Sequence, residues 1–243
     1  FDDTTLLGTV TAGVNGSWAY TTPVLPEGFH SFRATATDTA GNQSVASSAL
    51  VVTIDTKAPG APVISSWSDD AGVPGDGITS DATITLTGVA ESGATVRITD
   101  GGALLGLVTA GANGLWSFTT ATLTDRSYSF SATATDVAGN QSVASSALVL
   151  TIDTKAPGAP VINSWSDDTG VPGDGITSDA TITLTGVAES GATVRITDGG
   201  TLLGLVTAGA NGLWSFTTTT LTDGSYSFRA TATDAAGNQS VAS

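Results

Sequence analysis

Residues 82–90, ATITLTGVA, place small or apolar side chains at every second position. Ile84, Leu86 and Gly88 fall on one face of an extended chain, and threonines fall on the other. A period of two is typical of a β-strand with one buried face, because successive side chains of a strand point to opposite sides. This stretch therefore predicts a sheet.

Other short segments with the same alternation surround this one. Turn sequences separate them, including Asp100-Gly101-Gly102 and Asn113-Gly114. No segment has the period of an amphipathic helix. The expected strands are 61–67, 82–89, 94–99, 104–110, 115–121, 128–135 and 147–153. Seven short strands in about 100 residues predict an Ig-like β-sandwich, here without the cysteine pair of antibody domains.

The chain also repeats itself every 98 residues. Residues 6–22, LLGTVTAGVNGSWAYTT, match residues 104–120, LLGLVTAGANGLWSFTT. Segments 56–145 and 154–243 differ at only seven pairs of positions: 65/163, 71/169, 103/201, 121/219, 126/224, 131/229 and 137/235. We therefore expect an all-β protein whose tandem Ig-like seven-stranded β-sandwich domains form an end-to-end rod. The expected units are the C-terminal half of a repeat (1–55), a complete repeat (56–153) and a repeat lacking its last strand (154–243).

The composition narrows the classes of partner. The chain has 22 acidic residues, 7 Lys or Arg residues and a formal net charge of −15. This balance disfavours nucleic acid, whose phosphates need basic residues, and anionic membrane surfaces. No apolar run is long enough to span a bilayer, so we expect no membrane insertion in this segment. There is no cysteine to form a disulfide or act as a thiol catalyst. A cation is the partner that this charge suits.

Strand direction sorts the acidic residues of the complete repeat into two groups. In a seven-stranded sandwich, the first, third and fifth loops lie at one pole, and the even-numbered loops lie at the other. Asp69, Asp70, Asp76, Asp81, Asp100 and Asp125 belong to the first pole, together with Asp153 at the end of the last strand. Glu91, Asp136, Asn113 and Asn140 belong to the opposite pole. End-to-end stacking then brings carboxylates together, which is unfavourable unless something neutralises them.

Two interpretations of this arrangement remain open. Aspartate is common in solvated turns, where its side chain bonds to nearby backbone. Alternatively, Ca²⁺ binds the carboxylate, amide and carbonyl oxygens at each junction. Asp55 and Asp153 are the first candidates because they lie in the linkers. The full set of candidate metal ligands is Asp55, Asp153, Asp136, Asp234, Glu91, Glu189, Asp69, Asp70, Asp100, Asp2, Asn140 and Asn238.

Four motifs carry a family resemblance: DTKAPGAPVI (55–64), SDDAGVPGDGITSDATITLTGVAESGATVRITDGG (68–102), ANGLWSFTT (112–120) and YSFSATATDVAGNQSVAS (128–145). They resemble the bacterial Ig-like tandem repeats of giant type I-secreted (RTX-type) surface adhesins used in biofilm formation and attachment. The resemblance implies a monomeric extender on the cell surface that holds a distal adhesive module. It also implies Ca²⁺ between neighbouring repeats of the chain, bound by acidic residues that correspond to Asp55/Asp153, Asp136/Asp234 and the Asp69–Asp70 pair.

Two other functional classes compare less well with the sequence. An enzyme is disfavoured because the single histidine, His30, takes the place of Tyr128 and Tyr226 in the other repeats. A module that binds surface glycans or ice is the main alternative, since tryptophan rings stack on sugars. Trp116, however, alternates in phase with Phe118, which predicts a core position. We expect Trp67 and Trp165 to pack in the core or at a pole as well.

Overall fold

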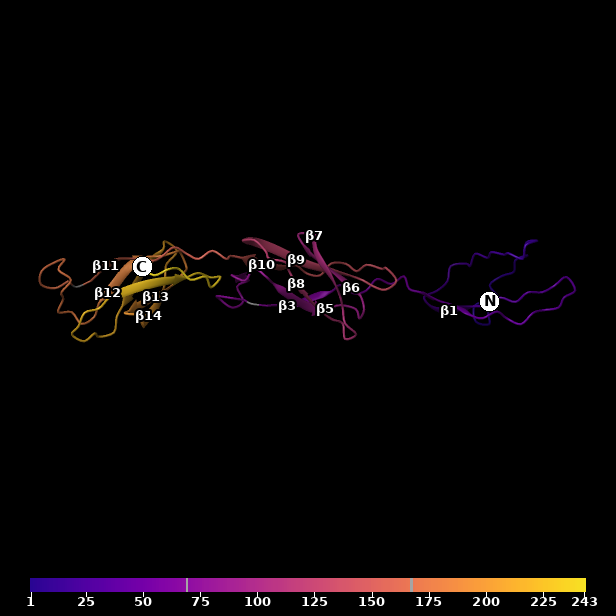
Figure 1. Ribbon diagram of the computed structural model, residues 1–243, viewed down its shortest axis with the longest axis horizontal. Coiled ribbons are helices and arrows are strands. Elements are labelled where there is room, and N and C mark those ends of the chain that lie inside the picture. Colours follow the sequence, from indigo (N-terminus) through magenta and orange to yellow (C-terminus); the bar gives the residue numbers. More distant parts are fainter. Residues whose placement is uncertain (69, 167) are drawn as a thin grey trace.

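The computed structural model describes residues 1–68, 70–166 and 168–243. Every regular element in these ranges is a β-strand, which confirms the all-β expectation. Three bodies follow one another along the long axis of the molecule, joined by single connecting segments (Figure 1). The described residues contain no helix that is long and apolar enough to cross a membrane.

The middle repeat is a sandwich of two sheets. One sheet has the order β3 (Val63–Trp67), β5 (Thr85–Val89) and β8 (Leu115–Thr119). The other has the order β4 (Ile78–Thr79), β10 (Leu148–Ile152), β9 (Arg126–Thr135), β6 (Thr95–Asp100) and β7 (Ala103–Thr109). The seven expected strands are therefore confirmed. We missed β4, which lies in the first loop and pairs in parallel with β10, because two residues are too few to show an alternation.

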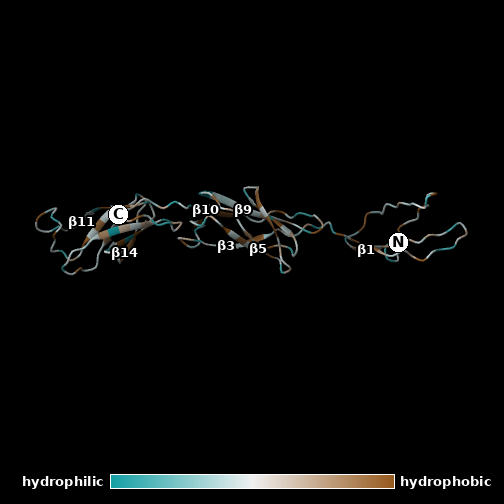
Figure 2. Cartoon of the chain, in the orientation of Figure 1, coloured by the Kyte–Doolittle hydropathy of each residue, from teal (hydrophilic) through white to brown (hydrophobic). Residues whose placement is uncertain are grey.

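The core of the middle repeat follows from the alternation in its strands. Ile84, Leu86, Trp116 and Phe130 are all buried between the two sheets. Gly88 has no space for a side chain, since a Cβ there would lie 2.4 Å from the Trp116 ring. Apolar and polar residues consequently alternate along the strands (Figure 2). Trp116 is a core residue and Trp67 packs against the same core, as the sequence predicted.

The third repeat has the same two layers. Its first sheet contains β11 (Val161–Trp165), β12 (Thr183–Val187) and β15 (Leu213–Thr217). Its second sheet contains β14 (Thr201–Thr207), β13 (Thr193–Asp198) and β16 (Phe228–Thr233). Trp165 packs against the core of this repeat, again as predicted.

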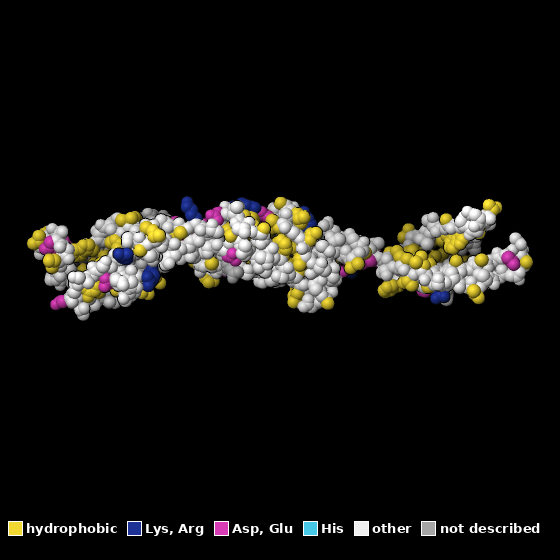
Figure 3. All heavy atoms as spheres, in the orientation of Figure 1, with side chains coloured by type: hydrophobic (Ala, Val, Ile, Leu, Met, Phe, Trp, Pro, Cys, Tyr) yellow, Lys and Arg dark blue, Asp and Glu magenta, His cyan; other side chains and the backbone are white. Residues whose placement is uncertain are grey.

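The N-terminal segment is more open. Its two strands, β1 (Gly28–Phe32) and β2 (Leu50–Ile54), pair in antiparallel fashion. Residues 6–22 match β7 and β8 of the middle repeat in sequence, but they form no strand. Hydrophobic side chains show on the surface of this segment (Figure 3).

His30 makes the same kind of ring contact in the N-terminal segment that tyrosine makes in the other two copies. The Tyr128 hydroxyl donates a hydrogen bond to the carbonyl of Thr124 (2.9 Å), and its ring stacks against Phe130. In the N-terminal segment, His30 Nε2 lies 2.9 Å from the carbonyl of Pro26, and its ring stacks against Phe32. The expectation that His30 replaces a strand aromatic is confirmed.

Candidate functional site at the repeat junctions

Hydrogen bonds gather two acidic loops of the middle repeat around the end of β10. The Asp153 N–H donates to Thr79 O in the first loop, the AB loop, at 3.0 Å. Thr154 N–H donates to Asp125 Oδ1 in the fifth loop at 3.1 Å. These bonds bring the acidic loops and the end of β10 to one pole, next to the linker that leads to the third repeat.

The linker aspartates use their backbone as well as their side chains. Asp55 Oδ1 accepts a hydrogen bond from Lys57 N–H, and Asp153 Oδ1 accepts one from Lys155 N–H, each at 3.1 Å. The carbonyl of each aspartate instead faces the next repeat. Asp55 and Asp153 lie at the junctions, and the atom of each that reaches across is the carbonyl oxygen.

The sixth loop, the FG loop, of the following repeat meets that carbonyl. Asn140 Nδ2 donates to Asp55 O at 3.0 Å and to Asp136 Oδ2 at 2.9 Å. A carboxylate oxygen and a carbonyl oxygen from adjacent repeats thus converge on one amide group. The hydrogen bonds from Asn140 also hold the pKa of Asp136 below its ordinary value.

The second junction repeats this geometry. Asn238 Nδ2 donates to Asp153 O at 2.8 Å and to Asp234 Oδ2 at 2.9 Å. The same three-residue arrangement at both junctions makes it the main candidate site of the molecule.

Asp70 lies in the AB loop, on the other side of the second junction. Its Oδ2 accepts a hydrogen bond from Gly75 N–H at 2.5 Å. Its Oδ1 is buried without a hydrogen-bond partner, and Asp168 Oδ1 in the third repeat is in the same state. A buried carboxylate oxygen without a partner is unfavourable. Asp69, the other candidate of this pair, lies outside the described residues.

Asp100 and Asp2 are engaged in contacts within their own repeats. Asp100 accepts hydrogen bonds from Ser129 N–H (2.8 Å) and from Arg126 Nη2 (2.7 Å). Burial raises the pKa of Asp100, but the Ser129 hydrogen bond and the Arg126 guanidinium outweigh it, and the pKa lies below its ordinary value. Asp2 contacts His30 Nδ1 at 2.5 Å, and this hydrogen bond lowers the pKa of Asp2.

The two candidate glutamates, Glu91 and Glu189, are exposed. The carbonyls of Glu91 and Glu189 close turns with Ala94 and Ala192, while their side chains point to solvent. Among the described residues, no three acidic or histidine side chains come together as a metal-binding group. The oxygens that do converge across a junction are one carboxylate and one carbonyl, held by asparagine.

Sequence reasoning missed the contribution of Arg126. Its guanidinium lies 3.7 Å from the centre of the Tyr128 ring and pairs with Asp100. The equivalent residue of the third repeat is Gly224, so position 126 is one of the seven that differ between the repeats. That difference was the available sequence signal that Arg126 makes a contact found in its own repeat.

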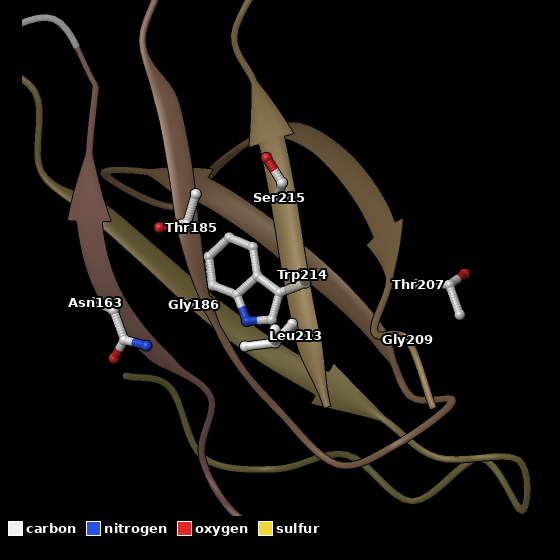
Figure 4. Close-up of a pocket in the computed structure, with 8 residues that line it drawn as sticks. All are labelled: Asn163, Thr185, Gly186, Thr207, Gly209, Leu213, Trp214 and Ser215. Atoms are coloured by element: carbon white, nitrogen blue, oxygen red, sulfur yellow. The ribbon is translucent and has the colours of Figure 1, made fainter. Parts of the chain in front are cut away.

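A second candidate site is an open groove on the third repeat, with a volume of about 560 Å³. Its lining includes Asn163, Thr185 and Trp214, with Trp214 between the neighbouring strands (Figure 4). A corresponding groove lies over Trp116. Both indoles are buried in the cores, so neither presents an open ring face on which a sugar could stack.

The sequence matches the model of one protein family, described as the bacterial Ig-like domain, over residues 1–56, 59–154 and 157–243. The chain belongs to the bacterial Ig-like domain family. Such domains are non-catalytic, which agrees with the sequence analysis, where an enzyme was disfavoured. The matched ranges assign one bacterial Ig-like domain to each of the three bodies in Figure 1.

Solved structures with similar folds include several from adhesins. A structure from a 1.5-MDa bacterial ice-binding adhesin is 24% identical, with a TM-score of 0.36 over 89% of this chain and 72% of that one. A tetra-tandem repeat from the extending region of a large adhesion protein is 24% identical, with a TM-score of 0.35 over 96% of this chain and 60% of that one. Fibronectin(III)-like modules of Clostridium thermocellum CbhA are 16% identical, with a TM-score of 0.43 over 73% and 90%. No curated protein matches the sequence.

Proposed function

We propose that these bacterial Ig-like domains are an extender segment of a bacterial cell-surface adhesin, which holds a distal adhesive module away from the cell. Near-identical repeats in a row support this role, because each added copy supplies length and the same surface again. The proposed location is extracellular, and the chain acts as a monomer whose partners are its own neighbouring repeats.

In this proposal Ca²⁺ stiffens the junctions. The observation that supports it is the convergence of Asp136 Oδ2 with Asp55 O, and of Asp234 Oδ2 with Asp153 O, at the same amide position. Carboxylate and carbonyl oxygens are hard ligands that Ca²⁺ prefers. Rotation of the asparagine amide would present a third oxygen, since its O and N are nearly isosteric.

Other candidates complete the proposed ligand supply. The unpaired Oδ1 of Asp70 faces no hydrogen-bond donor and suits a cation. Glu91 and Glu189 are exposed and can turn toward a junction, whereas Asp55 and Asp153 would first release their hydrogen bonds from Lys57 N–H and Lys155 N–H. Bound Ca²⁺ would neutralise the carboxylates of two repeats at once and so restrict bending at the linker.

The test compares the protein with and without chelator. Small-angle X-ray scattering should show a longer maximum dimension in 1 mM Ca²⁺ than in EGTA, and calorimetry should show a higher Tm. At about 100 times the Kd, one bound ion stabilises its site by about 2.7 kcal/mol. If EGTA alters neither quantity, calcium stiffening is wrong.

A matched variant pair localises the effect. Asp136→Ala should weaken the calcium response, whereas Asp38→Ala should leave it unchanged. Asp38 has the same bonds to Asn42, at 2.8 and 2.9 Å, but within the described residues Asn42 bonds to no carbonyl of another repeat. Equal effects of both variants would place the ion elsewhere. A glycan array tests the alternative of direct ligand binding, and reproducible hits would favour it.

A further inference from the structure

The FG loop of the third repeat (234–238) is held from two sides by the middle repeat. On the linker side, Asn238 bonds to the carbonyl of Asp153. On the other side, Val73 N–H donates to Ala235 O, and Ser80 N–H donates to Ala236 O, both at 3.1 Å. The last two bonds join backbone to backbone.

Glycine makes this approach possible. A Cβ on Gly72 would lie 2.0 Å from Ala235 O and 2.6 Å from Gly237 N, and Gly72 has a φ of 89° that favours glycine. A Cβ on Gly237, from the third repeat, would in turn lie 2.9 Å from Gly72 N. The two repeats therefore meet backbone to backbone, and Ala236 is only 1% exposed.

The AB loop that receives this contact is tied to the body of its repeat. Gly77 O accepts a hydrogen bond from Thr151 N–H at 2.8 Å, and Thr79 O accepts one from Asp153 N–H at 3.0 Å. Because β4 is part of the sheet, movement of the third repeat would have to break bonds or bend that sheet. The contact is therefore suited to fix the angle between the repeats.

We propose that this AB–FG contact is a metal-independent joint that sets the orientation of adjacent repeats. Its partner is the next bacterial Ig-like domain of the same chain, recognised through its backbone. The joint adds to calcium stiffening and does not depend on it, since both of its hydrogen bonds join backbone atoms and neither uses a carboxylate or the Asn238 amide.

Residue 71, equivalent to residue 169, adjusts this joint. In the third repeat, Thr169 Oγ1 accepts a hydrogen bond from Ser178 N–H at 2.7 Å. The equivalent donor in the middle repeat is Ser80 N–H. Position 71 is alanine there, which offers no side-chain acceptor, and Ser80 N–H donates to Ala236 O of the next repeat instead. A threonine at position 71 offers this donor an acceptor within its own loop, in competition with the neighbouring repeat.

The experiment measures the angle between repeats in EGTA. The chain has no cysteine, so Ser117→Cys and Ser215→Cys give one spin-label pair, on exposed positions of the middle and third repeats. Double electron–electron resonance should give a narrow distance distribution for this protein. Gly72→Ala should broaden it, because the added Cβ separates the two backbones.

Gly170→Ala is the matched control. Gly170 has nearly the same φ (90°), but a Cβ there meets nothing within 4 Å. Both variants carry the same backbone strain, so a broad distribution for Gly72→Ala alone supports the joint. A broad distribution for the parent protein in EGTA, or the same change in both variants, overturns it.

Two further readouts separate this inference from the proposed calcium function and from misfolding. Amide exchange should show that Val73 N–H loses protection in Gly72→Ala, while the strand amides of both repeats keep theirs. Ala71→Thr should broaden the distance distribution less than Gly72→Ala does, and Thr169→Ala should leave it unchanged. If Ala71→Thr has no effect, the proposed role of position 71 is wrong. Adding Ca²⁺ afterwards tests the calcium proposal independently. A distance distribution that becomes narrower when Ca²⁺ is added requires an ion site, whereas a distribution that is already narrow in EGTA does not.

Discussion

The middle repeat and the N-terminal segment contain the same tryptophan at equivalent positions, but its environment differs. Trp116 is 3% exposed, and Trp18 is 57% exposed. Both residues lie in closely matching sequences. Trp116 is covered because β5 lies beside β8 and places Gly88 against the ring. The comparison shows that an alternating pattern specifies which face a side chain takes, whereas burial requires the strands that complete the sandwich.

The largest effect is expected when the tryptophan ring is removed in each copy. We expect Trp116→Ala to lower the free energy of unfolding of its repeat by about 3–5 kcal/mol, because it leaves a large cavity in the core. Trp18→Ala should have a much smaller effect. Differential scanning calorimetry is the suitable measurement, since several repeats need not unfold in one transition. Equal shifts in the two variants would contradict the difference in burial.

A smaller effect is expected at the ion pair that only the middle repeat has. Arg126→Gln should lower the free energy of unfolding only slightly, since exposed ion pairs contribute little. The pKa of Asp100 should rise, because one of the groups that lower it is lost. An NMR titration of the Asp100 carboxylate measures this shift. The third repeat, which has Gly224 at the position equivalent to Arg126, is the internal reference.

The smallest expected effect is a pH dependence confined to the N-terminal segment. The Asp2 hydrogen bond raises the pKa of His30 above its ordinary value of about 6.5. The protonated imidazole therefore stabilises the segment below about pH 6.5, and this contribution is lost as the pH rises through the folded-state pKa. The lowered pKa of Asp2 places its own contribution above about pH 4, and it is lost on acidification.

The titration of His30 can be followed directly by NMR because it is the only histidine. Asp2→Asn should move its pKa back toward the ordinary value. His30→Tyr, which restores the residue of the other copies, should remove the pH dependence of stability between about pH 6.5 and the folded-state pKa of His30. An unshifted His30 in the parent protein would show that the contact with Asp2 does not form.

Most of the fold could be predicted from the sequence, for a physical reason. Burial on one side of a strand imposes a period of two, and the turns have their own residue preferences. The seven strands could therefore be predicted from the sequence. β4 could not, because two residues carry no period. Its pairing with β10 depends on a contact about 70 residues away in the sequence.

The candidate site was less accessible to sequence reasoning. The side chains of Asp55 and Asp153 were expected to face the junction, but each bonds to its own linker and leaves the carbonyl to reach Asn140 or Asn238. Backbone atoms are the same for every residue type, so no sequence pattern announces them. For the same reason, the sequence does not indicate that Gly72 lies against the backbone of another repeat.

The parallel pairing of β4 with β10 has a consequence for a chain under tension. β4 lies near the start of the middle repeat and β10 at its end, so a pull on the two ends drives these strands in opposite directions along their length. The bonds from Thr151 N–H to Gly77 O and from Asp153 N–H to Thr79 O are then loaded together in shear. Bonds loaded in shear must slide at once, whereas a hairpin peeled from one end opens one bond at a time. The middle repeat is thus built to resist extension at its last strand, next to the joint with the following repeat.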